Sequence, residues 1–348
     1  MVPDGMGLAD VTAARIQKNG LRALPLSFET LEHIGYQSTR SADSLITDSA
    51  AAASAWACGE KFANGEVCDH EDGRPTKPGI LELARKSGRS TGLVVTEALT
   101  DATPAAFGAH APSRDCRKEI ARQYIEETQV DVLLGGGRAV FISEESDPCG
   151  TGGDLLQRAK DKGYVVVSDR KALDRAIAEG TEKLLGLFSD RALTAEYIRT
   201  PETREPRLPE MTAAALKILE KDREGFFLLV EGSLVDKANH RNDFPYQVGE
   251  VLAFDEAVAV VRSWIDADLK RKGETLLIVV PDHETGGFAI TGPDFSEKEP
   301  LGKLETAWTG KGHTGVDTMI WSSGPGSERL GRAVDNTDIY DVMVGALK

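Results

Sequence analysis

The chain has 348 residues, a formal net charge of -15 and a pI near 5.0, with 41% hydrophobic and 28% charged residues. These values are ordinary for a globular protein and leave room for one large α/β domain. No run of about 18 apolar residues is present to span a membrane, and the acidic balance excludes a general nucleic-acid binder, which needs a basic face.

Apolar, β-branched runs alternate with helical patterns along the whole chain. In chain order the predicted elements are helices 9–19, 50–58 and 80–86, strand 92–96, helix 117–127, strand 130–134, helix 153–162, strands 164–168 and 184–188, helix 209–221, strand 226–230, helix 247–269, strands 275–280 and 318–321, and helix 337–347. This alternation indicates an α/β three-layer sandwich, with a central, mostly parallel sheet and helices on both faces. No linker or repeat divides the chain, so residues 1–348 are expected to form a single domain.

Acidic and histidine residues follow several predicted strands. Glu231 comes directly after strand 226–230, and Asp282 and His283 come after strand 275–280. Asp101 and Thr103 lie in the turn that follows strand 92–96. Because open parallel sheets bind ligands beyond the carboxyl ends of their strands, we expect these side chains to share one site.

Further candidate metal ligands lie outside the strands. Asp236 and His240 are four residues apart, a spacing that places both on one face of a helix. His313 lies in a glycine-flanked loop. Carboxylates combined with imidazoles suit Zn²⁺, whereas the oxygens of Asp4, Glu231 and Thr103 suit Mg²⁺. The remaining histidines, His33, His70 and His110, are interpreted as structural or surface residues.

Ser49 opens an alanine-rich helical segment, and two interpretations of this position stay open. Asp48 or Ser49 is either only an N-cap, or Ser49 is a nucleophile at a helix N-terminus, where the helix dipole favours an anion. A serine hydroxyl is a weak nucleophile at neutral pH, and metal coordination is one way to activate it.

Seven segments, taken together and in this order, resemble the alkaline phosphatase family of the bacterial type. They are Asp4–Gly7, Asp48–Gly59, Thr100–Ala106, Ala109–Arg114, Val230–Gly232 with Asp236 and His240, Pro281–Gly287 and Gly312–Gly315. The resemblance implies metal-dependent hydrolysis of phosphate monoesters through a phosphoserine intermediate, with an alkaline pH optimum. It also implies a homodimer in the periplasm or outside the cell.

The resemblance further implies a role for each matching residue. One zinc would be held by Asp236, His240 and His313, and a second zinc by Asp4, Asp282 and His283. One magnesium would be held by Asp4, Thr103 and Glu231, with Asp101 ordering its waters. Ser49 would be the nucleophile, Arg114 would clamp the phosphate, and Lys237 would contact the phosphate through water.

The cysteines and the first residues of the chain bear on its cellular compartment. Cysteine order suggests the pairs Cys58–Cys68 and Cys116–Cys149, which would favour an oxidising compartment, but four free or buried thiols remain an equal alternative. The first residues lack a signal peptide, so either an export signal is absent from this version of the chain or the protein is cytosolic. Of the apolar run that forms the family's first strand before Asp4, only Val2 and Pro3 remain, so this strand is expected to be truncated.

Three other functions are alternatives to phosphomonoester hydrolysis. A sulfatase would need a Cys or Ser within a C-x-P-x-R-like context, which Ser49 does not have. A phosphodiesterase of this architecture commonly has a threonine nucleophile and lacks the segments around Arg114 and Glu231. A non-catalytic metal or phosphate binder is disfavoured because every implied ligand is present.

Overall fold

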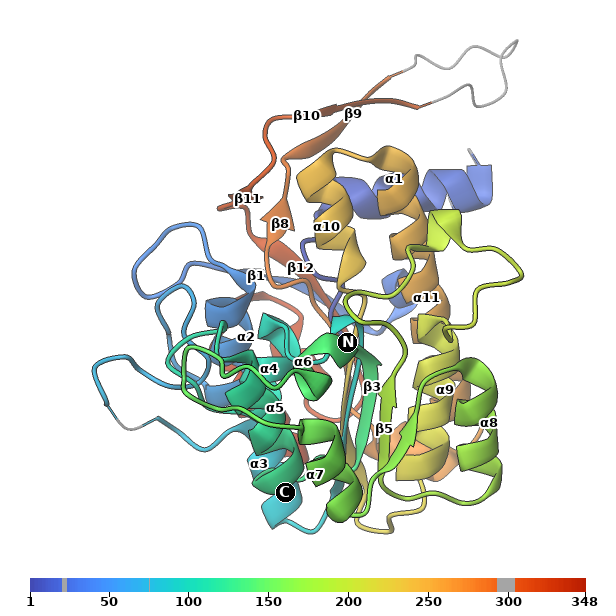
Figure 1. Ribbon diagram of the computed structural model, residues 1–348. Helices are drawn as coiled ribbons and strands as arrows, with labels where there is room; N and C mark the ends of the chain where they lie inside the picture. The colour runs from blue at the N-terminus through green and yellow to red at the C-terminus, as the bar shows by residue number, and fades with distance from the viewer. Residues whose placement is uncertain (21–23, 75, 293–303) are drawn as a thin grey trace.

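The computed structural model describes residues 1–20, 24–74, 76–292 and 304–348, and a five-stranded parallel sheet lies at its centre (Figure 1). Its strands are β2 (Ser90–Ala98), β3 (Val132–Gly136), β4 (Val165–Val167), β5 (Leu184–Leu187) and β6 (Phe226–Glu231). They lie in the order β4-β5-β3-β2-β6, and all four pairings are parallel. β3 and β5 are buried along their whole length, as strands covered on both faces must be.

A second sheet has four strands and mixed pairing. They are β1 (His33–Ser38), β7 (Leu277–Val279), β12 (Thr318–Ser323) and β13 (Ala333–Asp335), in the order β13-β1-β12-β7. β12 runs antiparallel to both β1 and β7, whereas β13 runs parallel to β1. The mostly parallel character predicted from the sequence therefore holds for the central sheet, and the second sheet adds antiparallel strands.

The first residues of the chain lie between the two sheets. Val2 forms a parallel bridge with Glu231, and its N–H donates to the carbonyl of Val230 at 2.8 Å. On the other side, the N–H of Val280 donates to the carbonyl of Met1 at 3.1 Å. Met1 and Val2 thus join β6 to the end of β7, and the residues that follow emerge beside the carboxyl ends of both strands.

Helices cover both faces of the central sheet (Figure 1). One face carries α1 (Leu8–Asn19), α8 (Arg170–Ala178), α9 (Leu208–Leu219) and α11 (Phe244–Asp266). The other carries α2 (Ser49–Cys58), α3 (Ile80–Lys86), α4 (Ala102–Gly108), α5 (Arg117–Glu126), α7 (Leu155–Asp161) and α13 (Asp338–Ala346). Each layer buries its own apolar cluster against the sheet, which confirms the predicted three-layer sandwich.

Shorter elements complete the chain. They are α6 (Arg138–Ile142), α10 (Leu234–Arg241), α12 (Leu269–Glu274) and the 3₁₀ turns η2 (Phe28–Thr30), η3 (Glu196–Ile198) and η4 (Ser327–Leu330). Two strand pairs are antiparallel: β8 (Glu284–Thr285) with β11 (His313–Thr314), and β9 (Phe288–Gly292) with β10 (Glu305–Trp308). The β9–β10 pair projects away from the body of the molecule (Figure 1). No helix in the described part of the chain is long and apolar enough to cross a lipid bilayer.

Most predicted elements are present, with three kinds of difference. The helix predicted over 247–269 begins earlier, at Phe244, because Asp243 is its N-cap and accepts a hydrogen bond from the Tyr246 N–H. The helix ends at Asp266, and α12 follows as a separate helix. β1, β13 and the short strands β8, β9, β10 and β11 were not predicted. In β1, Gly35 interrupts the apolar pattern, since a Cβ there would lie 2.1 Å from the carbonyl oxygen of Leu330. α4, α6, α8, α10 and α12 were also not predicted as whole helices.

Both locally paired disulfides are present. Cys58 bonds to Cys68 and Cys116 bonds to Cys149, so the pairing interpretation holds and the free-thiol alternative does not. Cys58 is the last residue of α2, the helix that begins at Ser49. The Cys58–Cys68 bond therefore ties the end of this helix to the loop that follows it.

Removing each disulfide should lower the free energy of unfolding by an amount that depends on the loop it closes. The sequence separations are 10 residues for Cys58–Cys68 and 33 for Cys116–Cys149. We expect the C58A/C68A variant to lose about 2–4 kcal/mol, and C116A/C149A to lose about 1 kcal/mol more, because the longer loop restricts the unfolded chain more. Urea unfolding without reductant measures both, and an unchanged free energy in C58A/C68A would contradict the expectation.

Candidate active site

A tight turn after the first residues places Asp4 at the end of the central sheet. Gly5 has φ +69°, in the left-handed region, and a Cβ there would lie 2.8 Å from the Thr285 Oγ1 and 2.9 Å from the Cα of Asp236. The sequence needs glycine at this position for both reasons. The Gly5 N–H donates to Asp282 Oδ1 at 3.0 Å, so the turn also anchors Asp282 beside Asp4.

Asp236, His240 and His313 form one cluster of candidate metal ligands. Asp236 and His240 lie one turn apart on α10, and His240 Nε2 is 3.2 Å from Asp236 Oδ1. His313, on β11, brings its Nε2 to within 3.6 Å of the same oxygen. One donor atom from each of the three residues falls within 4.8 Å of the others, which is a spacing that could hold a metal ion.

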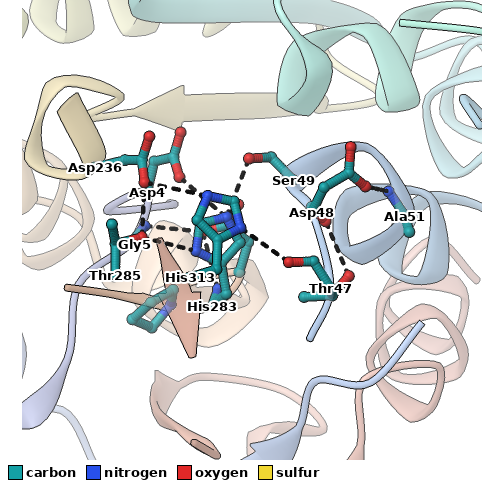
Figure 2. Close-up of polar contacts among 12 residues, drawn as sticks. Asp4, Gly5, Thr47, Asp48, Ser49, Ala51, Asp236, His283, Thr285 and His313 are labelled. Atoms are coloured by element: carbon teal, nitrogen blue, oxygen red, sulfur yellow. Dashed lines mark hydrogen bonds and ion pairs between the residues drawn. The ribbon is translucent and has the colours of Figure 1, made fainter. Parts of the chain in front are cut away.

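A second cluster surrounds the imidazole of His283 (Figure 2). His283 Nε2 lies 3.1 Å from Asp282 Oδ2 and 3.7 Å from Asp4 Oδ1. Asp4, Asp236 and His283 also bring donor atoms within 4.8 Å of one another. The rings of His283 and His313 stack with centroids 3.5 Å apart, so the two clusters are adjacent and Asp236 borders both.

Ser49 faces the second cluster from the start of α2. Its Oγ lies 3.1 Å from His283 Nε2, and the residue is only 4% exposed (Figure 2). Asp48, not Ser49, caps the helix, because Asp48 Oδ1 accepts from the Ala51 N–H at 2.9 Å. The capping interpretation therefore applies to Asp48 and leaves the Ser49 hydroxyl directed at the cluster.

The guanidinium of Arg114 spans two carboxylates near this helix start. It lies 3.0 Å from Asp48 Oδ2 and 3.4 Å from Asp101 Oδ1. The Arg114 N–H donates to the carbonyl of Gly65 at 2.8 Å, and the Gly65 N–H donates to Asp48 Oδ2 at 3.1 Å. Burial lowers the pKa of Arg114, but Asp101 and Asp48 outweigh this effect and raise it, so the side chain stays positively charged.

Several buried oxygens in the site have no hydrogen-bond partner among the described residues. They are both carboxylate oxygens of Asp4 and of Glu231 and the hydroxyl of Thr103. Asp4 and Glu231 are each 1% exposed. Buried polar groups are nearly always paired, so this set of oxygen donors fits the coordination of a cation.

Electrostatics favour the same conclusion. Burial raises the pKa of Asp4 well above its usual range, and the nearby carboxylates of Asp282, Asp236 and Glu231 raise it further. Burial and the carboxylate of Asp101 likewise raise the pKa of Glu231. A bound divalent cation would stabilise the ionised form of each carboxylate and remove the repulsion between them.

Lys237 contributes one positive charge at the edge of this group. Its Nζ lies 3.4 Å from Asp236 Oδ2. Burial lowers the pKa of Lys237, but Asp101 and Asp236 outweigh the burial and raise it. One ammonium is too little to balance four buried acids, and Arg114 is already paired with Asp48 and Asp101.

The structure brings the residues predicted from the sequence together at one site, with Asp101 and Thr103 beside Glu231. The role of each residue stays a prediction. The three other histidines lie outside it. His70 stacks on Phe62 with centroids 4.4 Å apart, and His110 contacts the carbonyl of Cys68 at 2.5 Å and Glu82 at 3.2 Å. His33 begins β1, in the second sheet.

A buried polar network behind the clusters was not predicted. Asp10 is 1% exposed and accepts from the Gly7 N–H at 2.6 Å and from Asn239 Nδ2 at 3.3 Å. Asn239 also donates to the carbonyl of Gly5 at 3.2 Å, so the network supports the Asp4 turn and α10 together. The sequence did contain a local signal for the position of Asp10. An acidic residue at the third position of a helix often accepts a hydrogen bond from the cap residue, and Asp10 holds that position in α1.

Stability should depend on pH through Asp10. Burial raises its pKa from 3.8 to about 8, against the opposing effect of the Gly7 N–H, so the folded state holds this proton when the unfolded state has released it. Stability contributed by Asp10 is therefore present at low pH and lost as pH rises toward 8.

We expect Asp10→Asn to gain stability relative to wild type between pH 4 and 8, by up to about 1.4 kcal/mol per pH unit, with no further gain above that range. Urea unfolding of the metal-free proteins across this range measures the difference. A difference that stays constant with pH would show that Asp10 does not retain its proton.

Comparison with known proteins places this chain in a family. A profile of the family described as alkaline phosphatase matches residues 1–304. Alkaline phosphatase 3 of Bacillus subtilis is 32% identical over 424 aligned positions, covering 100% of this chain and 88% of that relative. The repressible alkaline phosphatase of Saccharomyces cerevisiae is 42% identical over 315 positions, covering 83% of this chain but only 55% of the yeast protein. The chain therefore spans about half the length of the yeast relative.

Solved structures agree with the sequence relatives. A mutant of the alkaline phosphatase from the Antarctic bacterium TAB5, with Mg bound in its M3 site, superposes with a TM-score of 0.82 at 27% identity. The superposition covers 99% of this chain and 96% of the TAB5 chain. With a family profile over most of its length and relatives aligned over all of it, this chain belongs to the alkaline phosphatase family of phosphatase enzymes.

Proposed function

We propose that this protein hydrolyses phosphate monoesters at a site of two zinc ions and one magnesium ion, through a phosphoserine intermediate and with an alkaline pH optimum. The observation that carries the proposal is the position of the Ser49 hydroxyl, 3.1 Å from His283 Nε2 and next to buried carboxylates that lack hydrogen-bond partners among the described residues. The family is generally metal-dependent, which supports the same assignment.

The donor atoms suit the proposed ions. Asp236, His240 and His313 would hold one zinc, and Asp4, Asp282 and His283 the other, because mixed carboxylate and imidazole donors suit zinc. Asp4, Thr103 and Glu231 offer only oxygen donors and would hold magnesium. When bound, the cations would polarise the phosphoryl oxygens and lower the pKa of the oxygen nucleophiles.

Ser49 would act as the nucleophile. Its position at the N-terminus of α2 places the positive end of the helix dipole near the incoming phosphate. In the first step the seryl oxygen gives up its proton and bonds to phosphorus, while the ester P–O bond breaks and the alcohol departs. In the second step water cleaves the phosphoserine, which releases phosphate and restores the hydroxyl. An alkaline optimum follows because the attacking oxygen must be deprotonated.

Charged side chains around the nucleophile would bind and orient the phosphate. The planar fork of Arg114 can donate two parallel hydrogen bonds to phosphate oxygens once it turns from Asp48 and Asp101. Lys237 would contact the phosphate through water, and Asp101 would order waters around magnesium.

The proposal also covers the domain organisation, the oligomeric state, the cellular location and the substrates. Residues 1–348 would act as one catalytic domain, and two copies would form a homodimer. The bacterial relatives and the two disulfides support work in the periplasm or outside the cell, since disulfides persist in oxidising compartments. Small phosphomonoesters would be the substrates.

Ser49→Ala should lower the turnover of an aryl phosphate by roughly 10³-fold or more, because the variant lacks the attacking oxygen. Its zinc and magnesium content should stay at the wild-type level. Ser54→Ala is the matched control, since Ser54 lies on the same helix and is fully buried, but its hydroxyl bonds to the carbonyl of Glu66 at 3.3 Å. Ser49→Ala with wild-type turnover would exclude Ser49 as the nucleophile.

Metal removal tests the cofactor assignment. A chelator should abolish turnover, and zinc with magnesium should restore it. The chelated protein should also unfold at a lower urea concentration, since ions held at 100 times their dissociation constant add about 2.7 kcal/mol to the free energy of unfolding.

Comparing the turnover of a phosphate diester with that of the monoester distinguishes a diesterase from a monoesterase. Full activity after chelation, or preferred cleavage of the diester, would overturn the proposal.

A further inference from the structure

Thr285 lies where the two candidate zinc clusters meet, and it is not among the residues to which the resemblance assigns a ligand or catalytic role. It is fully buried on β8, and the β8–β11 ladder pairs it directly with His313. Its N–H donates to the carbonyl of Gly5 at 3.1 Å, so its backbone is also fixed to the turn that carries Asp4. The backbone position of Thr285 is therefore determined by segments from both clusters.

The hydroxyl of Thr285 contacts one proposed ligand from each cluster (Figure 2). Thr285 Oγ1 lies 2.7 Å from Asp236 Oδ1 and 3.2 Å from His283 Nδ1. Asp236 Oδ1 is also the oxygen that faces His240 and His313. His283 directs its other nitrogen, Nε2, toward Ser49 and Asp282.

Counting protons fixes the direction of these two hydrogen bonds. A threonine hydroxyl has one proton, and an ionised carboxylate can only accept, so the proton points to Asp236. The hydroxyl oxygen can then only accept from His283, which places a proton on Nδ1. In a neutral imidazole with a proton on Nδ1, Nε2 has a free lone pair and can bind a metal.

We propose that Thr285 is a positioning residue that orients Asp236 and sets the tautomer of His283, so that both side chains are ready to bind zinc. The inference rests on the proposed function, because it assumes that these two residues are zinc ligands. Groups that hydrogen-bond to metal ligands from outside usually change metal affinity by 10–100-fold when they are removed.

The space around the hydroxyl supports this role. A Cβ on residue 5 would lie 2.8 Å from Thr285 Oγ1, so the hydroxyl occupies a position that only glycine at residue 5 leaves open. Gly5 and Thr285 thus form a complementary pair, in which the missing side chain of one makes room for the hydroxyl of the other.

The test is zinc titration of the metal-stripped protein with a competing chelator as the reporter. Thr285→Val keeps the shape of the side chain but lacks the hydroxyl, and should weaken zinc binding at both sites by about 10–100-fold. Thr285→Ser keeps the hydroxyl and should stay within about threefold of wild type. Thr318→Val is the matched control, since Thr318 is 2% exposed and its hydroxyl donates to the carbonyl of Pro281 at 2.8 Å, outside the proposed ligands.

A second readout reports the hydrogen bond between Thr285 and His283 directly. In the zinc-loaded protein, the proton on His283 Nδ1 should give a downfield NMR signal in wild type and Thr285→Ser, because it donates to the hydroxyl. In Thr285→Val, which lacks the acceptor, this signal should move upfield. Wild-type zinc affinity in Thr285→Val, or the same Nδ1 proton signal in wild type and Thr285→Val, would overturn the inference.

The outcomes separate this inference from the proposed function. If the wild-type protein does not bind two zinc ions, the proposed function fails first. If wild type binds both ions and Thr285→Val binds them equally well, only the role of Thr285 is wrong. Equal losses in Thr285→Val and Thr318→Val would also refute a specific role, because any buried threonine would then have the same effect.

Discussion

The structure depends on the compensation of a group of buried negative charges. Asp4, Glu231 and Asp236 are each 1% exposed, and Asp282 is fully buried. Taking several carboxylates out of water together is strongly unfavourable unless each is paired, protonated or bound to a cation. Lys237 and the imidazoles offset part of this cost, but oxygens of Asp4 and Glu231 have no partner among the described residues. These unpartnered oxygens are donors that bound cations would neutralise, as the proposed function requires.

The topology explains how acids so far apart in sequence come together. β2 and β6 are parallel neighbours, so the residues that follow them emerge at the same edge of the sheet. The first residues of the chain pair with the end of β6 and with Val280, which carries Asp4 to that edge. β7 belongs to the second sheet, yet Met1 and Val2 join it to the first. The site therefore lies at the junction of two sheets, and the short segment before Asp4 is what aligns them there.

Much of this arrangement could be predicted from the sequence, because strand ends and helical spacing are local signals. Glu231 and Asp282 follow apolar runs, and Asp236 and His240 share a helix face whatever the rest of the chain does. Other features depend on contacts between distant segments and have no local signal. From the sequence, Gly5 cannot be distinguished from an ordinary turn glycine, because the close contact that requires it comes from the distant Thr285. The position of Thr285 in turn depends on its strand pairing with His313. β1 was missed for a similar reason, since its Gly35 is required by the approach of η4 and not by the strand itself.

Because the molecule has a negative net charge, the proposed metal ions would matter for substrate binding as well as for chemistry. A chain with a net charge of -15 repels a phosphate ester at long range, and screening by salt weakens this repulsion but does not reverse it. Within the site, Arg114 is paired with Asp48 and Asp101, and Lys237 lies beside Asp236, so neither cation is free to attract an anion unaided. Cations bound to the acids would convert the centre of the site from negative to positive and would let Arg114 exchange its carboxylate partners for phosphate oxygens. If the proposed cations bind there, metal occupancy would govern substrate affinity as well as chemistry, and Thr285 would affect both because it contacts one proposed ligand of each zinc.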